Sequence, residues 1–162
     1  MNDSETDQKQ LVKKLPKIKK TVKEFFDLLG LEPYGFELTI KEKRWIYIDL
    51  EYADQGLLIG SRGETLMSLQ LMLRLILYKR LDFWVPIILN VGNYLQQREE
   101  SLQKVAQNLS QKVKFSHKTQ ELNNLNSAER RIIHLFLKEN PDVVTESMDT
   151  ADGRKLLINP KS

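Results

Sequence analysis

The segment Gly60-Ser61-Arg62-Gly63, here named the GSRG loop, has residue types that could bind a ligand. Its outer positions have no side chains, so a sugar-phosphate backbone can approach main-chain N–H groups there. The residues that follow have helical apolar spacing, and the positive end of that helix would face the same phosphates. Arg62 adds a mobile positive charge. The pattern predicts a phosphate-binding loop, although glycines at this spacing also mark ordinary turns. No Gly-Lys-Ser/Thr follows, which excludes a P-loop.

A second candidate site is a row of basic residues near the C-terminal end. At about 100° per residue, Arg130, His134 and Lys138 share one face of a helix, with Arg131 beside them. These four residues are named the basic strip. Arginine can bind a phosphate bidentately and histidine can hydrogen-bond or stack on a base, so the strip suits a single-stranded nucleic acid. The alternatives are an ordinary solvated helix face, or a bond that ties His134 to the last strands near Arg154.

The sequence offers little to a catalytic centre. It has no cysteine, which excludes disulfides, thiol catalysis and Cys-rich zinc sites and makes a reducing cytoplasm the natural compartment. His117 and His134 lack metal-ligand spacing, and no Ser-His-Asp order or recognisable pair of acids is present. Glu99 and Glu100 are typical of a solvated helix face. We therefore expect no enzymatic activity and no cofactor.

Length and composition indicate a globular protein with an uneven charge distribution. The 162 residues fit one ordinary domain or two small ones, and a hydrophobic content of 41% is enough for a core. The net charge is +3, but residues 9–23 hold seven lysines and no acid. This segment either attracts nucleic acid or another acidic surface, or is a solubilising, partly disordered tail. Polar residues interrupt the most apolar run, at 66–78, so we expect no membrane insertion.

The apolar pattern of the first half predicts the elements that would position the GSRG loop. Residues 1–15 lack clear periodicity and are expected to be flexible. The following elements are, in chain order, a helix at 16–29, strands at 36–40 and 45–50 with a hairpin at 41–44, a helical turn at 56–59, the GSRG loop, a helix at 64–80 and a strand at 85–91. Pro86 suits the start of a strand or an edge strand.

The second half predicts the elements that would carry the basic strip. Residues 94–113 have the spacing of an amphipathic helix. Asn126 and Glu129 have the spacing of a capping box, so the next helix should start close to Arg130. Two final strands are predicted at 143–148 and 154–158, joined through an Asp152-Gly153 turn.

This order of elements is that of a type II KH domain, and the resemblance extends to motifs. Residues 58–66, followed by Val91-Gly92-Asn93-Tyr94 and Arg98-Glu99-Glu100, resemble the bacterial Jag family, also called KhpB. In that family a KH domain precedes a domain named for an Arg and a His with three residues between them, the RxxxH domain. Arg130 and His134 match that pattern. The resemblance implies an α+β fold, with a KH domain at 16–92 and an RxxxH domain at 93–160.

The resemblance also implies a function. Members bind single-stranded RNA, so Ile59, Leu66 and the GSRG loop are expected to contact RNA in the first domain and the basic strip in the second, with single-stranded DNA as an alternative ligand. The implied role is bacterial post-transcriptional control linked to cell division and envelope growth. Longer members carry an additional N-terminal domain, for which the residues before Pro16 leave no room. A protein-interaction adaptor, whose KH fold holds a protein partner, is the competing hypothesis.

The helix at 64–80 carries more apolar surface than one sheet can cover. One face is expected in the core and holds Leu66, Leu69, Met72, Leu73, Ile76 and Leu77. A second face, named the α-stripe, holds Met67, Leu71, Leu75 and Tyr78 and is separated from the first by polar residues. Because such a strip is unlikely to remain in water, we expect it to be covered. A second KH domain, in a homodimer or in a small single-KH partner, is favoured over the helix at 94–113.

Overall fold

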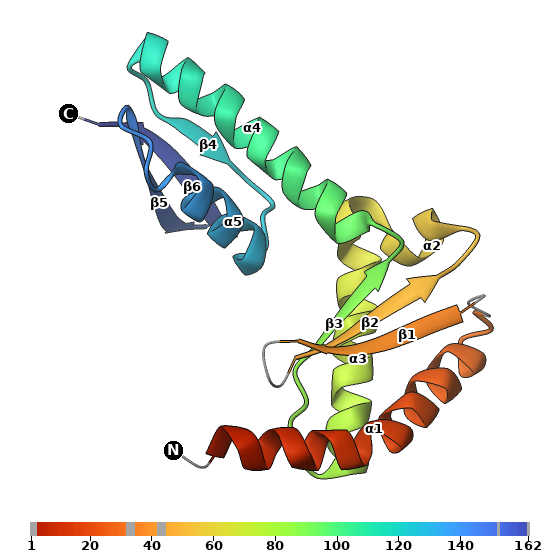
Figure 1. Ribbon diagram of the computed structural model, residues 1–162. Coiled ribbons are helices and arrows are strands. Elements are labelled where there is room, and N and C mark those ends of the chain that lie inside the picture. The colour runs from red at the N-terminus through yellow and green to blue at the C-terminus, as the bar shows by residue number, and fades with distance from the viewer. Residues whose placement is uncertain (1–2, 32–34, 42–44, 152, 162) are drawn as a thin grey trace. The chain divides into compact units, whose positions relative to one another are not determined.

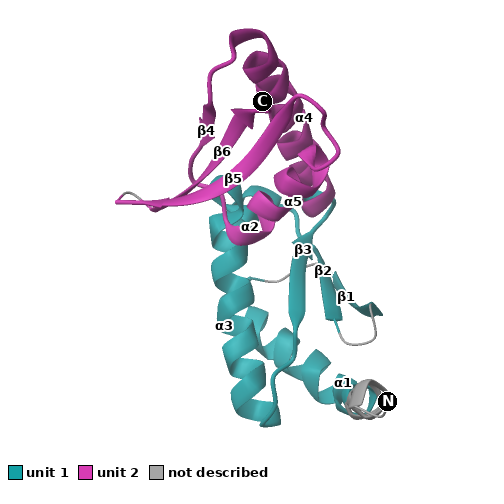
Figure 2. Cartoon of the chain, turned by 90° about the vertical axis from the view of Figure 1, so that its left-hand side faces the viewer, with its two compact units in different colours: residues 1–94 teal, residues 95–162 magenta. Residues whose placement is uncertain are grey.

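The computed structural model describes residues 3–31, 35–41, 45–151 and 153–161. It has a mixed α+β fold and divides into two compact units, Met1–Tyr94 and Leu95–Ser162 (Figure 2). In the described part of the chain, no helix is both long and apolar enough to cross a bilayer. Each unit has its own hydrophobic core.

Unit 1 contains a sheet with helices packed on one of its faces (Figure 1). Its elements are α1 (Asp3–Leu28), β1 (Gly35–Lys41), β2 (Trp45–Glu51), α2 (Gln55–Ile59), the 3-10 turn η1 (Ser61–Gly63), α3 (Glu64–Leu81) and β3 (Ile87–Val91). The strand order is β1-β2-β3, with β1 antiparallel and β3 parallel to β2. A parallel pair needs a crossover, which α2, the GSRG loop and α3 supply. Pro86 immediately precedes β3, which is an edge strand. This position suits proline, because proline has no N–H to donate to a neighbouring strand. Residues 42–44 of the expected hairpin lie outside the described residues.

Alternating side chains of β2 explain which face of the sheet is covered. Ile46, Ile48 and Leu50 are at most 1% exposed, and they join α1 and α3 in one core. Leu66, Leu69, Leu73 and Leu77 of α3 are buried there as expected. Met72 is not, at 48% exposed, because it lies about 60° around the helix from Leu69, beyond the arc that the sheet and α1 cover. Leu81 extends the buried face instead.

Helix α1 begins at Asp3, inside the segment expected to be a flexible tail. Leu11 is 3% exposed and Leu15 packs against the core, so the helix is anchored well before Pro16. Pro16 lies inside the helix, where it lacks an N–H for the carbonyl four residues earlier. The apolar positions 11, 15, 18 and 22 continue one helical face, but the lysines between them obscure that periodicity in the sequence.

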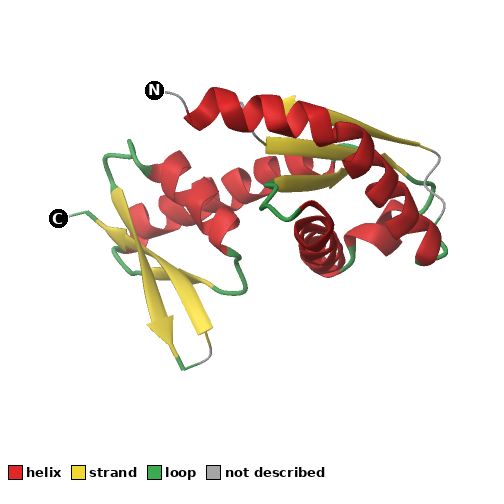
Figure 3. Cartoon of the chain, turned by 90° about the horizontal axis from the view of Figure 1, so that it is seen from below, coloured by secondary structure: helices red, strands yellow, loops and turns green. Residues whose placement is uncertain are grey.

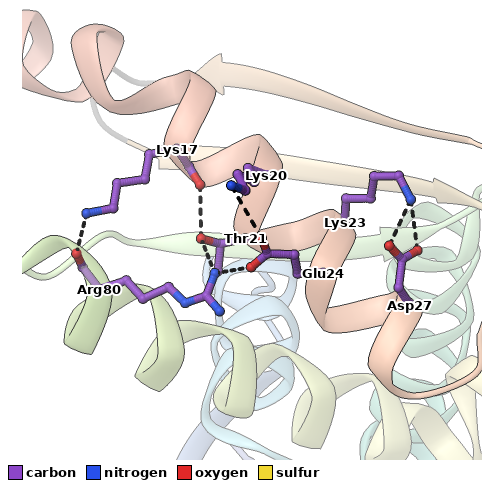
Figure 4. Close-up of polar contacts among 7 residues, drawn as sticks. All are labelled: Lys17, Lys20, Thr21, Lys23, Glu24, Asp27 and Arg80. Carbon is purple, nitrogen blue, oxygen red and sulfur yellow. Dashed lines mark hydrogen bonds and ion pairs between the residues drawn. The ribbon is translucent and has the colours of Figure 1, made fainter.

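Two lysines of α1 bind the C-terminal end of α3, and Figure 4 shows the contact made by Lys17. Lys17 Nζ donates to the carbonyl of Arg80 at 2.8 Å, and Lys14 Nζ donates to the carbonyl of Leu81 at 3.0 Å. These carbonyls belong to the last turn of α3, where cations are favoured. In return, Arg80 donates to the hydroxyl of Thr21 at 3.2 Å and to the carboxylate of Glu24. Part of the basic segment is thus engaged inside unit 1.

Unit 2 packs two helices on one face of an antiparallel sheet (Figure 3). Its elements are α4 (Tyr94–Ser116), β4 (Gln120–Leu122), α5 (Ser127–Leu137), β5 (Val143–Thr150) and β6 (Gly153–Pro160), with strand order β4-β6-β5. Both predicted final strands are confirmed and extend further than expected. Asp152 of the expected turn lies outside the described residues, while Thr150 pairs with Gly153. The short strand β4 was not predicted.

Candidate nucleic-acid interface

The two glycines of the GSRG loop occupy positions that no other residue fits. Gly60 has φ +69°, and a Cβ there would lie 2.0 Å from Thr65 Oγ1. Gly63 has φ +84°, and a Cβ there would lie 2.5 Å from the hydroxyl oxygen of Tyr94. Each site thus combines a left-handed backbone with a steric block. Both glycines are required by this conformation, which connects α2 to α3 through the exposed residues Ser61 and Arg62.

The tip of the loop is exposed and conformationally strained. Ser61 and Arg62 are both exposed, and Arg62 adopts φ 52° and ψ 24°. A left-handed conformation costs a non-glycine residue about 1–2 kcal/mol, and such strain is often found at ligand clamps. Among the described residues, no side chain caps the N-terminus of α3 at Gly63. Glu64 places a carboxylate in the same first turn, which offsets part of the positive charge of Arg62.

The apolar residues beside the loop are less available than expected. Leu66 is 3% exposed, so the expectation that it touches a base is wrong: its side chain faces the core of unit 1. Ile59 is half-buried, and it packs against the same core. From the sequence Tyr94 belonged to the family motif and to the apolar face of the helix at 94–113, and the structure places its ring next to Gly63.

Two polar residues of α3 bind the outer edge of β3. Gln70 Oε1 accepts from the N–H of Leu89 at 2.8 Å, and Arg74 Nη2 donates to the carbonyl of Ile87 at 2.8 Å. From the sequence, Gln70 and Arg74 were identified only as polar residues between the two apolar faces of the helix. Their hydrogen bonds to β3 could not be predicted, because a contact with a distant strand leaves no local pattern in the sequence. The edge of β3 that faces away from β2 is therefore partly satisfied by side chains.

The α-stripe is exposed along its whole length. Met67 is 41% exposed, Leu71 54%, Leu75 53% and Tyr78 50%. Trp84 extends the exposed apolar surface beyond Tyr78. It is 51% exposed, and its ring centroid lies 6.0 Å from that of Tyr78. The guanidinium of Arg74 lies 5.5 Å from the Trp84 ring centroid. Together they form an apolar and aromatic patch with a cationic border.

The structure places Arg130, Arg131 and His134 on α5 and Lys138 at its C-terminal cap, and it gives Arg130 and His134 internal partners. Arg131 and Lys138 are exposed. Arg130 is half-buried, and its Nη1 donates to the carbonyl of Leu125 at 2.5 Å. His134 is exposed, yet its Nδ1 lies 2.6 Å from the hydroxyl of Thr145 on β5. A bond from His134 to the last strands is thus present, although it reaches Thr145 and not the neighbourhood of Arg154.

A capping box holds the first turn of α5, as the sequence predicted. Asn126 Oδ1 accepts from the N–H of Glu129 at 2.9 Å, and Glu129 Oε2 accepts from the N–H of Asn126 at 2.9 Å. The other oxygen of Glu129 accepts from Arg98 Nε at 2.8 Å, with Nη2 at 2.7 Å. Because Glu129 is only 6% exposed, Arg98 supplies the countercharge that its burial requires. Arg98 on α4 therefore fixes the start of the helix that carries Arg130.

Comparison with known proteins identifies relatives of both halves. The family model of the Arg-xxx-His domain, the RxxxH domain, matches residues 100–160, which include Arg130 and His134. The RNA-binding protein KhpB of Clostridium symbiosum is 37% identical over 114 residues, which cover 70% of this chain and 51% of that protein. The RNA-binding protein KhpB of Bacillus subtilis is 30% identical over 128 residues, 77% of this chain and 62% of that protein. The chain thus spans about half the length of the first of these relatives.

Proposed function

The chain belongs to the KhpB family, and from this premise we propose that it binds single-stranded RNA. The GSRG loop of a type II KH domain at residues 16–92 would hold the phosphate backbone. The basic strip of an RxxxH domain at residues 93–160 would add a second contact. The relatives are named as RNA-binding proteins, and unit 1 has the element order αββααβ that the KH assignment requires.

The geometry of the GSRG loop carries this proposal. The loop presents the exposed residues Ser61 and Arg62 between two glycines whose side-chain space is taken by Thr65 and Tyr94. The N–H groups of Gly60, Gly63 and Glu64 already donate to carbonyls. Phosphate oxygens would therefore accept from the N–H groups of Ser61 and Arg62 and from the first turn of α3 after Glu64, with the Arg62 side chain as a flexible countercharge. Such contacts provide affinity without sequence choice, so base preference has to come from neighbouring side chains. The resemblance further suggests post-transcriptional control linked to cell division and envelope growth.

The α-stripe supports a second, protein contact. We propose that Met67, Leu71, Leu75 and Tyr78 pack against the KH domain of another chain, either a second copy or a small single-KH partner. An exposed strip of large apolar side chains marks an interaction surface in soluble proteins. If this contact were the main function, the protein would be an adaptor, and its partner binding would be insensitive to salt. RNA binding should weaken steeply with salt.

A charge-reversed loop tests the RNA proposal. In Ser61→Asp with Arg62→Asp, two carboxylates stand where phosphates must approach, and both positions are exposed, so the fold should survive. Ser101→Asp with Lys104→Asp is the matched control, because it makes the same charge change at exposed positions of α4. We expect the loop variant to lose most of its affinity for a single-stranded RNA at moderate salt and the control to keep it. Equal RNA affinities of the loop variant and the control would rule out the loop as the main RNA contact. Binding of a DNA strand of the same sequence by the wild-type chain tests whether the protein distinguishes ribose from deoxyribose.

A further inference from the structure

A tryptophan is exposed at the end of α3 that is farther from the GSRG loop. Trp84 belongs to the segment 82–86, which joins α3 to β3, and it is 51% exposed. Tyr78 lies beside it and is 50% exposed. The planes of the two rings are inclined at 59°, so they are not stacked face to face. Neither ring packs in the core of unit 1, so the pair is a surface feature and the fold does not depend on it.

Cations surround this aromatic pair. The guanidinium of Arg74 lies over the Trp84 ring, 5.5 Å from its centroid. Lys14 of α1 lies over the neighbouring Phe83 ring, with Nζ 4.1 Å from the centroid. Both lysines of α1 that bind this end of α3 donate to main-chain carbonyls, so those bonds leave the lysine charges unneutralised. Asp82 is exposed in the same segment and offsets part of this positive charge.

We infer that Trp84 is a base-stacking platform that extends the RNA contact of unit 1 beyond the GSRG loop. Proteins bind single strands through aromatic side chains on which bases stack and through cations that follow the phosphate backbone. This end of α3 has both, and its positive charge complements RNA. The inference rests on the proposed RNA binding. Because Tyr78 also belongs to the α-stripe, the stacking role is assigned to Trp84.

The distance between the loop and the platform sets the length of RNA that can use both. Helix α3 has 18 residues, so at about 1.5 Å per residue it separates the GSRG loop from Trp84 by about 27 Å. A loop of this kind holds about four nucleotides, so a tetranucleotide bound there leaves Trp84 empty. A strand of about twelve nucleotides extends about 40 Å even at a stacked spacing of about 3.4 Å, and it reaches both.

Trp84→Ala in the full chain tests the platform, with Trp84→Phe as the variant that keeps an aromatic ring. Because Trp84 is exposed and outside the core, both variants should fold. We expect Trp84→Ala to weaken binding of an RNA of about twelve nucleotides by about fivefold to a hundredfold, the range for one stacked base. Binding of a tetranucleotide, measured by competition, should not change. Trp84→Phe should keep most of the affinity for the longer strand.

The salt dependence and a control variant identify the kind of contact. Trp84→Ala should leave the slope of log Kobs against log salt unchanged, because an aromatic ring displaces no counterions from the RNA. Phe115→Ala is the matched control, since Phe115 is 79% exposed on α4 and should change neither the affinity nor the slope. A weaker slope in Trp84→Ala would assign the lost affinity to phosphate contacts and would overturn the stacking role.

Tryptophan fluorescence gives a readout at the residue itself. The chain has two tryptophans, so Trp45→Phe leaves Trp84 as the single tryptophan. Trp45 is half-buried on β2 and lies outside the core of unit 1, so this variant should fold. Stacking on a base should quench the emission of Trp84 when the longer RNA binds and leave it unchanged when the tetranucleotide binds.

The outcomes separate this inference from the proposed function. If Trp84→Ala keeps the wild-type affinity for the longer strand while the charge-reversed loop abolishes binding, the platform is wrong and RNA binding stands. If the wild-type chain binds no RNA, both fall. If Trp84→Ala prevents association with a second chain in sedimentation and RNA affinity persists, the occupant of this surface is a protein, and the inference is overturned.

Discussion

Gly63 and Tyr94 are the pair of residues on which the shape of the GSRG loop depends most. The aromatic ring fills the space that any side chain at position 63 would need, because a Cβ there would lie 2.5 Å from the hydroxyl oxygen and 3.1 Å from two ring carbons. Tyr94 follows β3 and starts α4, so it holds the loop from a part of the chain remote in sequence. The loop conformation is thus built into unit 1 before any ligand arrives.

Gly63→Ala should lower the free energy of unfolding by about 2–4 kcal/mol, since the left-handed backbone costs about 1 kcal/mol and the clash adds about 1–3 kcal/mol. Gly30→Ala is the matched control, because Gly30 has φ +65° but nothing within 4 Å of its Cβ position. Gly30→Ala should lower the free energy of unfolding only by the cost of the left-handed backbone. Urea denaturation of both variants measures the difference, and Tyr94→Phe should recover part of the Gly63→Ala loss. Equal losses at the two glycines would show that Tyr94 does not constrain the loop.

His134 is the member of the basic strip whose role is most open to test. If Arg130 and His134 contact RNA, alanine at either should weaken binding by about 1–3 kcal/mol. Thr145→Val removes the bond to His134 at 2.6 Å and leaves the imidazole in place, so it should preserve most of the affinity. Titration of fluorescent RNA measures the three variants. A large drop in melting temperature for His134→Ala, without a binding defect, would instead assign it a structural role.

The contact between Glu24 of α1 and Arg80 of α3 should make the free energy of unfolding depend on pH. The hydrogen bond from Arg80 is the largest cause that lowers the pKa of Glu24 below 4.5, its ordinary value. A lowered pKa in the folded state means that the carboxylate contributes stability above pH 4.5 and loses it as the pH falls through the folded-state pKa. Glu24→Gln should therefore flatten the acid limb of the plot of unfolding free energy against pH. The same acid limb in both proteins would show that this contact does not affect stability.

Among the elements, α3 shows most clearly what a sequence can and cannot predict. Its length, its buried leucines and the exposed α-stripe follow from helical periodicity, and the capping box of α5 follows from a local pattern. Local patterns do not reveal which arc of a helix its neighbours cover, so Met72 was misplaced. They also miss partners distant in sequence, such as Gln70 with the N–H of Leu89 and Arg74 with the carbonyl of Ile87.

The remaining differences also have physical causes. Helix α1 was predicted too short because lysines surround Leu11 and Leu15, and two of those lysines, Lys14 and Lys17, acquire partners only when α1 packs against α3. The strand β4 has three residues, too few to show alternation, and it is defined by pairing with β6. At the candidate site, the glycine requirement could be anticipated, but the position of the Tyr94 ring beside Gly63 depends on a tertiary contact.

The α-stripe is the surface through which we expect the chain to associate with a second KH domain. Met67→Glu with Leu71→Glu should give a folded protein that no longer associates, because two charges would be buried in an apolar contact. Met72→Glu is the control on the same helix, since Met72 is 48% exposed but lies outside the stripe. Sedimentation of the chain alone and with a single-KH protein measures the mass. A wild-type chain that stays monomeric at high concentration and gains no mass with that protein would contradict the proposed contact with another chain.

In the whole molecule, each compact unit has one proposed nucleic-acid contact. In this proposal unit 1 contributes the GSRG loop and unit 2 contributes the basic strip on and beside α5. Two modest contacts on one chain raise the overall affinity when a single RNA strand reaches both. A strand too short to reach both should bind with the affinity of one unit alone.

Photo-crosslinking of the full chain to a uniform single-stranded RNA, followed by mass spectrometry of the crosslinked peptides, tests the central claim most directly. We predict crosslinks in the peptides that contain Gly60 to Gly63 and in those that contain α5, with the first set lost in the Ser61→Asp, Arg62→Asp variant. Crosslinks that map only outside both segments, or a chain that forms none under conditions where a known single-strand-binding protein does, would contradict the account.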